Sequence, residues 1–303
     1  MKLKDLPSAG VEIKSLSVDQ EGKDLATEIQ IQLRDLGILD PPVDGSFGPV
    51  SQLALQMFAA RVGLAFDEKI TKAMADALIA NSVDTLFPLE LGNDFASRIV
   101  KYMQMKNYWL ARSPGYLNIV YVEGVDEDGT PNDDAPNKFN DRRLLIEIKG
   151  KKTTFVGNWE GTTEPGRKFT MSPENAAGAA RIAFGQYKSW RVGLHNRLKA
   201  SKHEALVQVA DITVHRDLNK DFKRTLDKTD VGSGFGINQH KGFNMPVGDI
   251  GLASAGCLVG RTNKGHEEFM AKVKTDVRFA KGSNGYKFMT TVIDGADLKT
   301  LVG

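Results

Sequence analysis

Cysteine is almost absent from this chain of 303 residues, in which Cys257 is the only one. A single cysteine excludes an intramolecular disulfide and a cysteine-rich zinc site, so Cys257 is either a buried apolar residue or a reactive thiol. The sequence also lacks an apolar run of about eighteen residues, the length that a membrane-spanning helix needs. Its N-terminus turns polar too early for a signal peptide, so neither membrane insertion nor a recognisable secretion signal is expected.

An excess of one charge is missing as well. The 40 basic and 38 acidic side chains leave a formal net charge of +2, which does not favour nucleic acid as a partner. The hydrophobic fraction of 41% and the charged fraction of 26% are those of an ordinary globular protein. The chain is about twice as long as a typical domain of ~150 residues, so two domains are expected.

Two parts of the chain differ in charge and periodicity. Residues 1–81 hold 8 basic and 12 acidic side chains, whereas residues 82–303 hold 32 and 26. We expect an α+β multidomain protein. Its parts would be a small all-α three-helix domain over 1–81, a connecting helix and linker over 82–115, and a mainly-β domain, a mixed β-sandwich, over 116–303.

Local patterns place the elements. Apolar residues repeat at helical intervals from Leu25 to Leu36 and stop at Gly37, a residue common just after a helix end. Pro49 suits the first turn of a second helix. A third short helix ends near Asn81, and the linker helix is expected to carry Phe95, Ile99, Tyr102 and Trp109 on one stripe. β-branched and aromatic residues predict strands over 116–122, 142–149, 205–214 and 286–293, with helices only near 175–187 and 265–273.

The loop between the first two helices reads Val43-Asp44-Gly45-Ser46-Phe47-Gly48-Pro49. Asp44 can accept a hydrogen bond from the backbone two residues on, Phe47 can anchor the loop, and both glycines can take positive φ. The order of helix, loop and helix over residues 22–81 resembles the small three-helix peptidoglycan-binding domain. That resemblance implies binding to the bacterial cell wall through the motif residues Asp44, Gly45, Phe47 and Gly48.

The sole cysteine ends a turn of small residues, Ser254-Ala255-Gly256-Cys257, and His240 precedes it by 17 positions. A cysteine nucleophile needs a base within hydrogen-bond reach and backbone N–H groups aimed at the developing oxyanion. Gly256 permits that close approach of the backbone. Because an unperturbed thiol is mostly protonated at neutral pH, an imidazolium at His240 is the expected activator.

These residues resemble the signature of the L,D-transpeptidase family of bacterial cell-wall enzymes, in which a histidine is followed by a serine, a glycine and a cysteine. The resemblance implies Cys257 as nucleophile, His240 as general base, and Ser254 and Gly256 as the signature serine and glycine, with amides near Gly256 and Cys257 holding the oxyanion. The segment 161–166 resembles the family's TPxG turn. An acyl-enzyme at a stem-peptide amide bond would result, and its acceptor, a second stem peptide or water, stays open.

Substrate contacts are expected from Arg261, Asn238 and Trp159. Two departures from the family pattern matter: Ala255 stands where many members have a second histidine, and Arg261 is displaced from the usual arginine position. They support an alternative, a non-enzymatic wall-binding or particle-associated protein with a degenerate catalytic fold.

Other chemistry is less favoured by the sequence. A zinc peptidase built from His195, His203 and Asp211 follows no recognisable ligand spacing, and both histidines are expected in or beside solvated loops. His215 is expected at the surface or behind the site. Asp217–Asp221 begins like a calcium loop but lacks its glycine and closing glutamate, which leaves at most another kind of cation site. No metal or cofactor is expected, and the oligomeric state is undetermined.

Peptidoglycan, both glycan and stem peptides, is therefore the expected partner. Action at the cell wall without a recognisable signal peptide predicts synthesis in the cytoplasm and release by lysis or another route. A phage-type wall hydrolase is a variant of this hypothesis.

Overall fold

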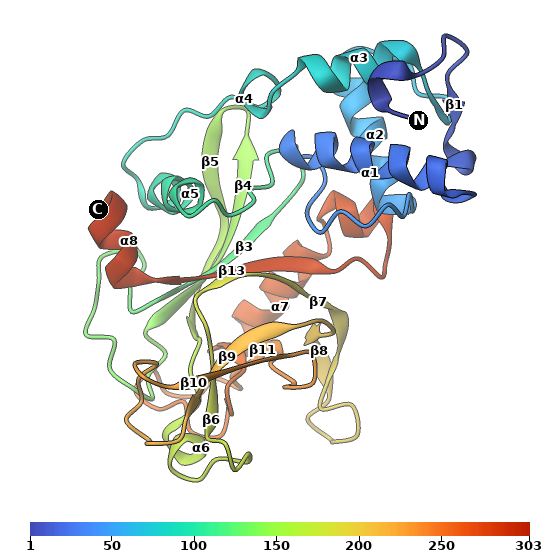
Figure 1. Cartoon of the computed structure of the whole chain (residues 1–303). Coiled ribbons are helices and arrows are strands. Elements are labelled where there is room, and N and C mark those ends of the chain that lie inside the picture. The colour runs from blue at the N-terminus through green and yellow to red at the C-terminus, as the bar shows by residue number, and fades with distance from the viewer.

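Helices gather at the N-terminal end of the chain and strands over the remainder (Figure 1), in a computed structural model that describes residues 1–303. The architecture is α+β. The N-terminal part contains α1 (Gln20–Asp35), α2 (Pro49–Arg61) and α3 (Lys72–Ala80). It also contains the short helices η1 (Leu3–Asp5) and η2 (Ile13–Ser17) and a two-stranded sheet of β1 (Val11–Glu12) and β2 (Lys69–Ile70). The N-terminal part is thus not made of three helices alone.

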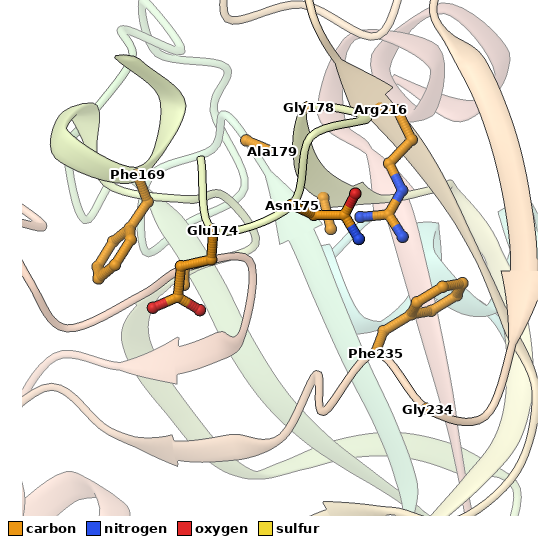
Figure 2. A pocket seen from close by; sticks show the side chains of 10 residues that line it. Phe169, Glu174, Asn175, Gly178, Ala179, Arg216, Gly234 and Phe235 are labelled. Atoms are coloured by element: carbon orange, nitrogen blue, oxygen red, sulfur yellow. The ribbon is translucent and has the colours of Figure 1, made fainter. Parts of the chain in front are cut away.

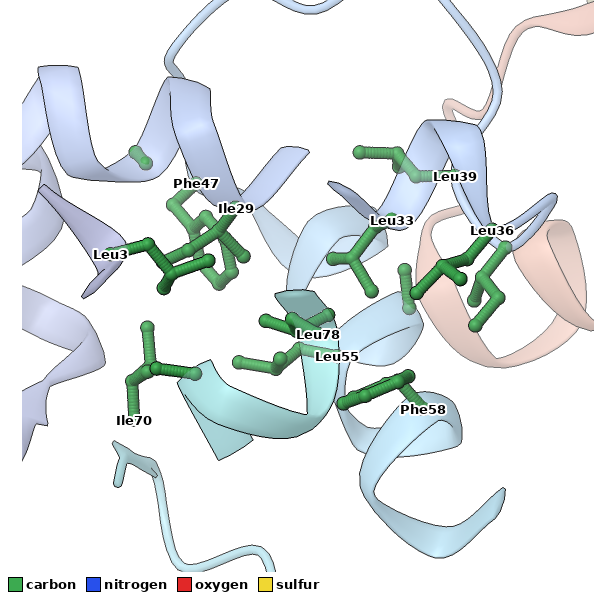
Figure 3. Packing of buried hydrophobic residues seen from close by; sticks show 14 of the residues in the cluster. Leu3, Ile29, Leu33, Leu36, Leu39, Phe47, Leu55, Phe58, Ile70 and Leu78 are labelled. Atoms are coloured by element: carbon green, nitrogen blue, oxygen red, sulfur yellow. The ribbon is translucent and has the colours of Figure 1, made fainter. Parts of the chain in front are cut away.

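Local signals explain where these helices begin and end. The Asp19 carboxylate accepts a hydrogen bond from the Gly22 N–H at 2.7 Å at the start of α1, and Gly37, just beyond the helix, has a φ of +71°. Pro49 is the first residue of α2. The apolar faces of α1, α2 and α3 join apolar residues of the neighbouring segments in one core of 20 buried residues (Figure 3). This core continues past Asn81 to Leu86 and Phe87.

The connecting segment holds two helices, α4 (Val83–Leu86) and α5 (Phe95–Met105). The apolar stripe of α5 is buried at Phe95, Ile99 and Tyr102, as the spacing predicts. Trp109 is not on that stripe, because α5 ends before it. Its indole N–H instead donates to the Arg34 carbonyl of α1 at 3.0 Å.

Eight strands make one closed, mixed sheet, in which each strand has two neighbours. Their order is β11-β12-β5-β4-β3-β13-β7-β8, and β8 pairs back with β11. The bounds are β3 (Asn118–Glu123), β4 (Asp141–Lys149), β5 (Lys152–Thr162), β7 (Gly185–His195), β8 (His203–Gln208), β11 (Gln239–Lys241), β12 (Leu258–Gly260) and β13 (Phe288–Asp294). The predicted β-sandwich is therefore wrong: the large sheet closes on itself instead of stacking on a second sheet.

A small antiparallel sheet lies beside it, in the order β10-β9-β6. Its strands are β6 (Ala179–Ile182), β9 (Ile212–Asp217) and β10 (Lys228–Gly232). The single strand predicted over 205–214 is two strands, because the chain leaves β8 at Gln208 and enters the other sheet. The helix predicted over 175–187 is also wrong. Its alanines favour a helix, but pairing of β6 with β9 and a φ of +110° at Gly178 override that preference.

The remaining helices cover the sheet or its ends. They are α6 (Arg167–Met171), α7 (Asn263–Val273), the short helical segment η3 (Arg278–Gly282) and α8 (Gly295–Val302). The α7 helix confirms the one predicted over 265–273. No helix of the chain combines the length and the apolar character that crossing a membrane requires.

Buried polar groups join the N-terminal part to the strands. The carboxylate of Asp40, which is 1% exposed, accepts from the Tyr286 hydroxyl at 2.8 Å and from the Lys188 ammonium at 2.9 Å. Arg278 lies 4.0 Å from the same carboxylate and pairs with Asp276 at 2.6 Å. These contacts hold the two parts in one arrangement.

Candidate active site

His240 and Cys257 belong to neighbouring strands of the closed sheet. His240 is the middle residue of β11, and Cys257 directly precedes β12. The strands run parallel with His240 opposite Val259, so Cys257 is two residues short of the position opposite the histidine. Both side chains line one cavity of about 330 Å³. The structure thus brings the predicted nucleophile and base to the same cavity.

Ser254 and Gly256 fix the turn that presents Cys257. The Ser254 hydroxyl donates to the Cys257 carbonyl at 2.9 Å and accepts from the Gly256 N–H at 3.1 Å. Gly256 has a φ of +130°, and a Cβ there would lie 2.4 Å from the Ala180 carbonyl oxygen, so the turn requires glycine. Because the Gly256 N–H is used inside the turn, it is not free for an oxyanion as the sequence suggested. The Cys257 N–H has no protein acceptor.

The turn over 161–166 supports this loop from outside. The Gly166 N–H donates to the Ser254 carbonyl at 2.8 Å. A Cβ on Gly166 would lie 2.3 Å from the Gly251 carbonyl oxygen. A second glycine is therefore required for the loops around Cys257 to pack.

The Cys257 thiol is held by the segment before β11. Its Sγ accepts from the Asn238 N–H at 3.4 Å and donates to the Gly236 carbonyl at 3.5 Å. Burial raises the pKa of this thiol to about 11, and the negative charge of Glu174 adds to the rise, against the lowering by the Asn238 N–H. Cys257 is therefore a thiol at neutral pH, not a thiolate.

The His240 imidazole is also uncharged. Its Nδ1 contacts the Lys241 carbonyl oxygen at 2.8 Å, and since a carbonyl only accepts, Nδ1 carries the proton and Nε2 is left as the acceptor. Burial holds the pKa of His240 well below its usual value, and the nearby His195 lowers it further. The imidazolium expected from the sequence is therefore wrong: the resting pair is a neutral thiol and a neutral imidazole.

Three more histidines lie around His240, which the sequence did not predict. His195 stacks on His240 with ring centroids 4.0 Å apart and planes 11° from parallel. His203 meets His195 and His240 at centroid distances of 5.3 and 5.8 Å. His266 of α7 meets His203 at 5.7 Å, and burial lowers its pKa to about 3. His195 and His203 lie at the paired ends of β7 and β8 and not in solvated loops.

The three residues expected to contact substrate do not line the cavity. Arg261 pairs with the Glu160 carboxylate and donates to the Met245 carbonyl at 3.1 Å. Trp159 donates its indole N–H to Glu268 at 3.1 Å.

Asn238 has an internal role as well. Its side-chain Oδ1 accepts from the Gln208 N–H at 2.9 Å, and its side-chain Nδ2 lies 2.9 Å from the Nδ1 of His195. Asn238 therefore positions the thiol and a histidine and is not placed to touch substrate.

A second cavity, of about 250 Å³, adjoins the first (Figure 2). The two share the lining residues Phe169, Glu174, Ala180, Phe235 and Ala255. Glu174 and Arg216 line this second cavity, and neither was predicted from the sequence. Arg216 ends a β-rich run and no local pattern marks it, because only the pairing of β6 with β9 brings it near the cysteine turn.

The N-terminal motif forms a compact loop. The Asp44 carboxylate accepts from the Ser46 N–H at 2.9 Å, which confirms the predicted turn. Gly45 has a φ of +71°, and Phe47 is 5% exposed in the core, both as expected. Gly48 differs, because its φ is −84° and it caps the start of α2.

Gln30 of α1 organises this loop, a role that was not predicted from the sequence. Its Oε1 accepts from the Gly45 N–H at 2.8 Å, and its Nε2 donates to Asp44 and Ser51 at 3.1 Å each. The sequence does mark Gln30, because it is a polar residue on the otherwise apolar face of the predicted helix. Asp44 and Gly48 line a cavity of about 280 Å³ whose lining also includes Lys188.

The cation alternatives find no support in the geometry. His195 and His203 face each other across the β7–β8 pairing, and no group of three or more suitable side chains is arranged to hold a metal ion. The Asp217 carboxylate is occupied by its own loop at Asp221 and by Arg181 at 3.3 Å. His215 lies on β9 and lines neither cavity.

No protein-family model matches the chain, and no curated protein matches it either. Two solved structures are similar to it, each with a TM-score of 0.25. One is a fused Zn-dependent amidase/peptidase/peptidoglycan-binding domain-containing protein from Clostridium acetobutylicum, 12% identical, with 88% of this chain and 94% of that chain covered. The other is the L,D-transpeptidase from Xylanimonas cellulosilytica, 14% identical, with 88% and 92% covered. These similarities do not assign the chain to a family.

Proposed function

We propose that this chain is a peptidoglycan-acting cysteine enzyme that cleaves or transfers at stem-peptide amide bonds through an acyl-enzyme. One observation carries the proposal: a thiol and an imidazole with a free Nε2 line one cavity, beside an N–H without a protein partner. The resemblance of the His240 and Cys257 segment to L,D-transpeptidases supplies the substrate class.

Acylation begins with attack of the Cys257 Sγ on the substrate carbonyl carbon. The thiol proton passes to Nε2 of His240, and the carbonyl oxygen becomes an oxyanion that the Cys257 N–H stabilises. The tetrahedral intermediate collapses when the C–N bond breaks and His240 returns the proton to the leaving amine. The product is a thioester on Cys257 and a free amine.

Deacylation reverses these roles. A water molecule or the amine of a second stem peptide loses a proton to His240 and attacks the thioester carbon, and the thiolate leaves and is reprotonated. Water gives hydrolysis, and an amine gives a new cross-link.

The neutral resting pair sets how the first step proceeds. A thiol with a pKa of about 11 is ionised to only about 0.01% at pH 7. The thiol proton therefore moves to His240 in the same step in which the sulfur attacks the carbonyl carbon, and no separate ionisation of the thiol comes first. This behaviour protects the thiol from oxidation when no substrate is bound, because the thiolate is the reactive form.

Residues 1–81 are proposed as the wall-binding module. Residues 82–115 would be the linker, and residues 116–303 the catalytic part. The motif loop and the cavity of about 280 Å³ beside Asp44 and Gly48 support this. Cell-wall action follows as the proposed location.

A second candidate is a wall-binding protein without catalysis. The raised pKa of Cys257 favours it, because a catalytic thiol is usually activated. The two candidates differ in whether any muropeptide is turned over.

Incubation with defined muropeptides, followed by mass analysis, tests the proposal. The wild type should remove a residue, exchange it, or break a bridge, and Cys257→Ser should abolish this turnover because its hydroxyl is far less acidic than a thiol. Wall binding and the melting temperature should stay unchanged. Full activity in Cys257→Ser would rule out the cysteine mechanism, and inactivity of the wild type would favour the binding protein.

A further inference from the structure

The guanidinium of Arg216 is held in place but left partly without partners. Arg216 lies on β9 and is 8% exposed. Its Nε donates to Asp230 at 2.7 Å, and its guanidinium carbon lies 5.0 Å from the centre of the Phe235 ring. Neither terminal nitrogen has a protein acceptor, and the side chain lines the second cavity, where Figure 2 shows it pointing inward above Phe235.

The terminal nitrogens of Arg216 open into the second cavity, where a ligand can complete their hydrogen bonds. The two terminal nitrogens present parallel N–H groups, which match the two oxygens of a carboxylate. The exposed partner Asp230, whose side chain is 48% exposed, occupies only the Nε. The cavity face of Arg216 is therefore complementary to a carboxylate.

This face is close to the nucleophile. Arg216 is paired with Ala180 in the β6–β9 ladder, one strand spacing or roughly 5 Å away. The carbonyl of Ala180 contacts Gly256, the residue before Cys257. Ala255 lines both cavities, so the two adjoin directly beside the cysteine turn. A peptide residue spans roughly 3.3 Å, so one or two residues give a substrate carboxylate a reach of roughly 3–7 Å from the reacting carbonyl toward the second cavity.

We propose that Arg216 binds a free carboxylate of the substrate peptide, within one or two residues of the bond attacked by Cys257. This inference rests on the proposed function for its substrate, and it assigns to Arg216 the arginine contact with substrate that the sequence predicts for Arg261. Arg261 cannot take that role, because its guanidinium is paired with Glu160 outside both cavities. Arg216 is thus a specificity-determining residue of the site.

The test uses the full chain and a series of stem peptides in which one carboxylate at a time is replaced by a carboxamide. For the wild type, one member of the series should lose roughly 10- to 100-fold in kcat/KM. Arg216→Gln should lower kcat/KM for the all-carboxylate peptide by a similar factor and remove the discrimination. Arg216→Lys should restore part of the discrimination between the peptides, because a single ammonium keeps the charge but not the paired geometry.

Two controls separate this effect from damage to the fold. Arg261→Gln removes an arginine outside the cavities and should leave the discrimination unchanged. Asp230→Asn frees Arg216 from its one carboxylate partner and should tighten binding of the carboxylate peptide severalfold. Equal kcat/KM for all members of the series in the wild type, with turnover intact, would overturn the proposal for Arg216.

Failure of the proposed function is recognised separately. If the wild type turns over no peptide, the series is titrated calorimetrically against wild type and Arg216→Gln. Selective loss of one peptide's binding in Arg216→Gln would then support the carboxylate site without catalysis. Equal binding by both proteins would reject it.

Discussion

The imidazole of His195 lies flat against that of His240, with ring centroids 4.0 Å apart and planes 11° from parallel. Two stacked imidazoles disfavour a positive charge on either ring, and burial lowers the pKa of His195 to about 4. The arrangement keeps His240 neutral, which is the form a general base needs.

We expect His195→Phe to raise the pKa of His240, because the variant keeps a ring in the stack but removes a group that can become positive. A base must be neutral, so the acid limb of the kcat/KM profile should move to higher pH. Rates measured between about pH 3 and pH 7, a range that includes the pKa of His195 at about 4, would show the shift. His215→Phe, outside both cavities, should leave the limb in place, and an unmoved limb in His195→Phe would contradict this role.

The ionisation of Cys257 should respond to Glu174, whose charge raises the pKa of the thiol. Glu174→Gln should lower that pKa and speed alkylation by iodoacetamide at pH 8. The gain should be about two- to threefold, since Glu174 is exposed and screened. In the wild type the rate should keep rising toward pH 11, without the plateau near neutrality that a thiolate–imidazolium pair produces. Glu267→Gln on α7 serves as the control, and a slower reaction of Glu174→Gln would reverse the sign assigned here.

Gly256→Ala should damage the cysteine turn severely. Its φ of +130° is strained for alanine, and the added Cβ would lie 2.4 Å from the Ala180 carbonyl. We expect a loss of about 2–4 kcal/mol in the free energy of unfolding, measured by urea titration, together with loss of turnover. Gly248→Ala, whose Cβ would meet no atom within 4 Å, should change neither quantity. Equal stability of both variants would show that the turn relaxes easily.

Gln30→Ala should loosen the motif loop, because it removes the acceptor for the Gly45 N–H and the donor to Asp44 and Ser51. A cost of about 2–3 kcal/mol in unfolding free energy is expected. Retention of the full chain on insoluble peptidoglycan should fall with it. Gln32→Ala on the same helix is the matched control. Unchanged retention despite a loosened loop would separate wall binding from the motif.

Sequence reasoning succeeded where the signal was local. Gly37 and Pro49 mark helix ends by their own backbone preferences, and the Asp44 turn is closed within three residues. Cys257 and His240, which line one cavity, could be paired from the sequence because their motif is nearly continuous in the chain. The environment of the pair was not found, because His195 and Arg216 arrive through strand pairings between distant segments. The alanines before β6 show the same limit, since their helical preference yields to pairing with β9.

The Asp40 carboxylate, bonded to Tyr286 and Lys188 between the two parts of the chain, fixes the distance between the proposed wall-binding loop and Cys257. A loosely tethered enzyme would search every stem peptide within the reach of its linker. If the loop holds a glycan strand as proposed, the thiol lies at one fixed distance from that strand. The stem-peptide bonds that are cleaved or formed along one glycan strand would then be spaced by the repeat of the polymer and would not occur at random positions.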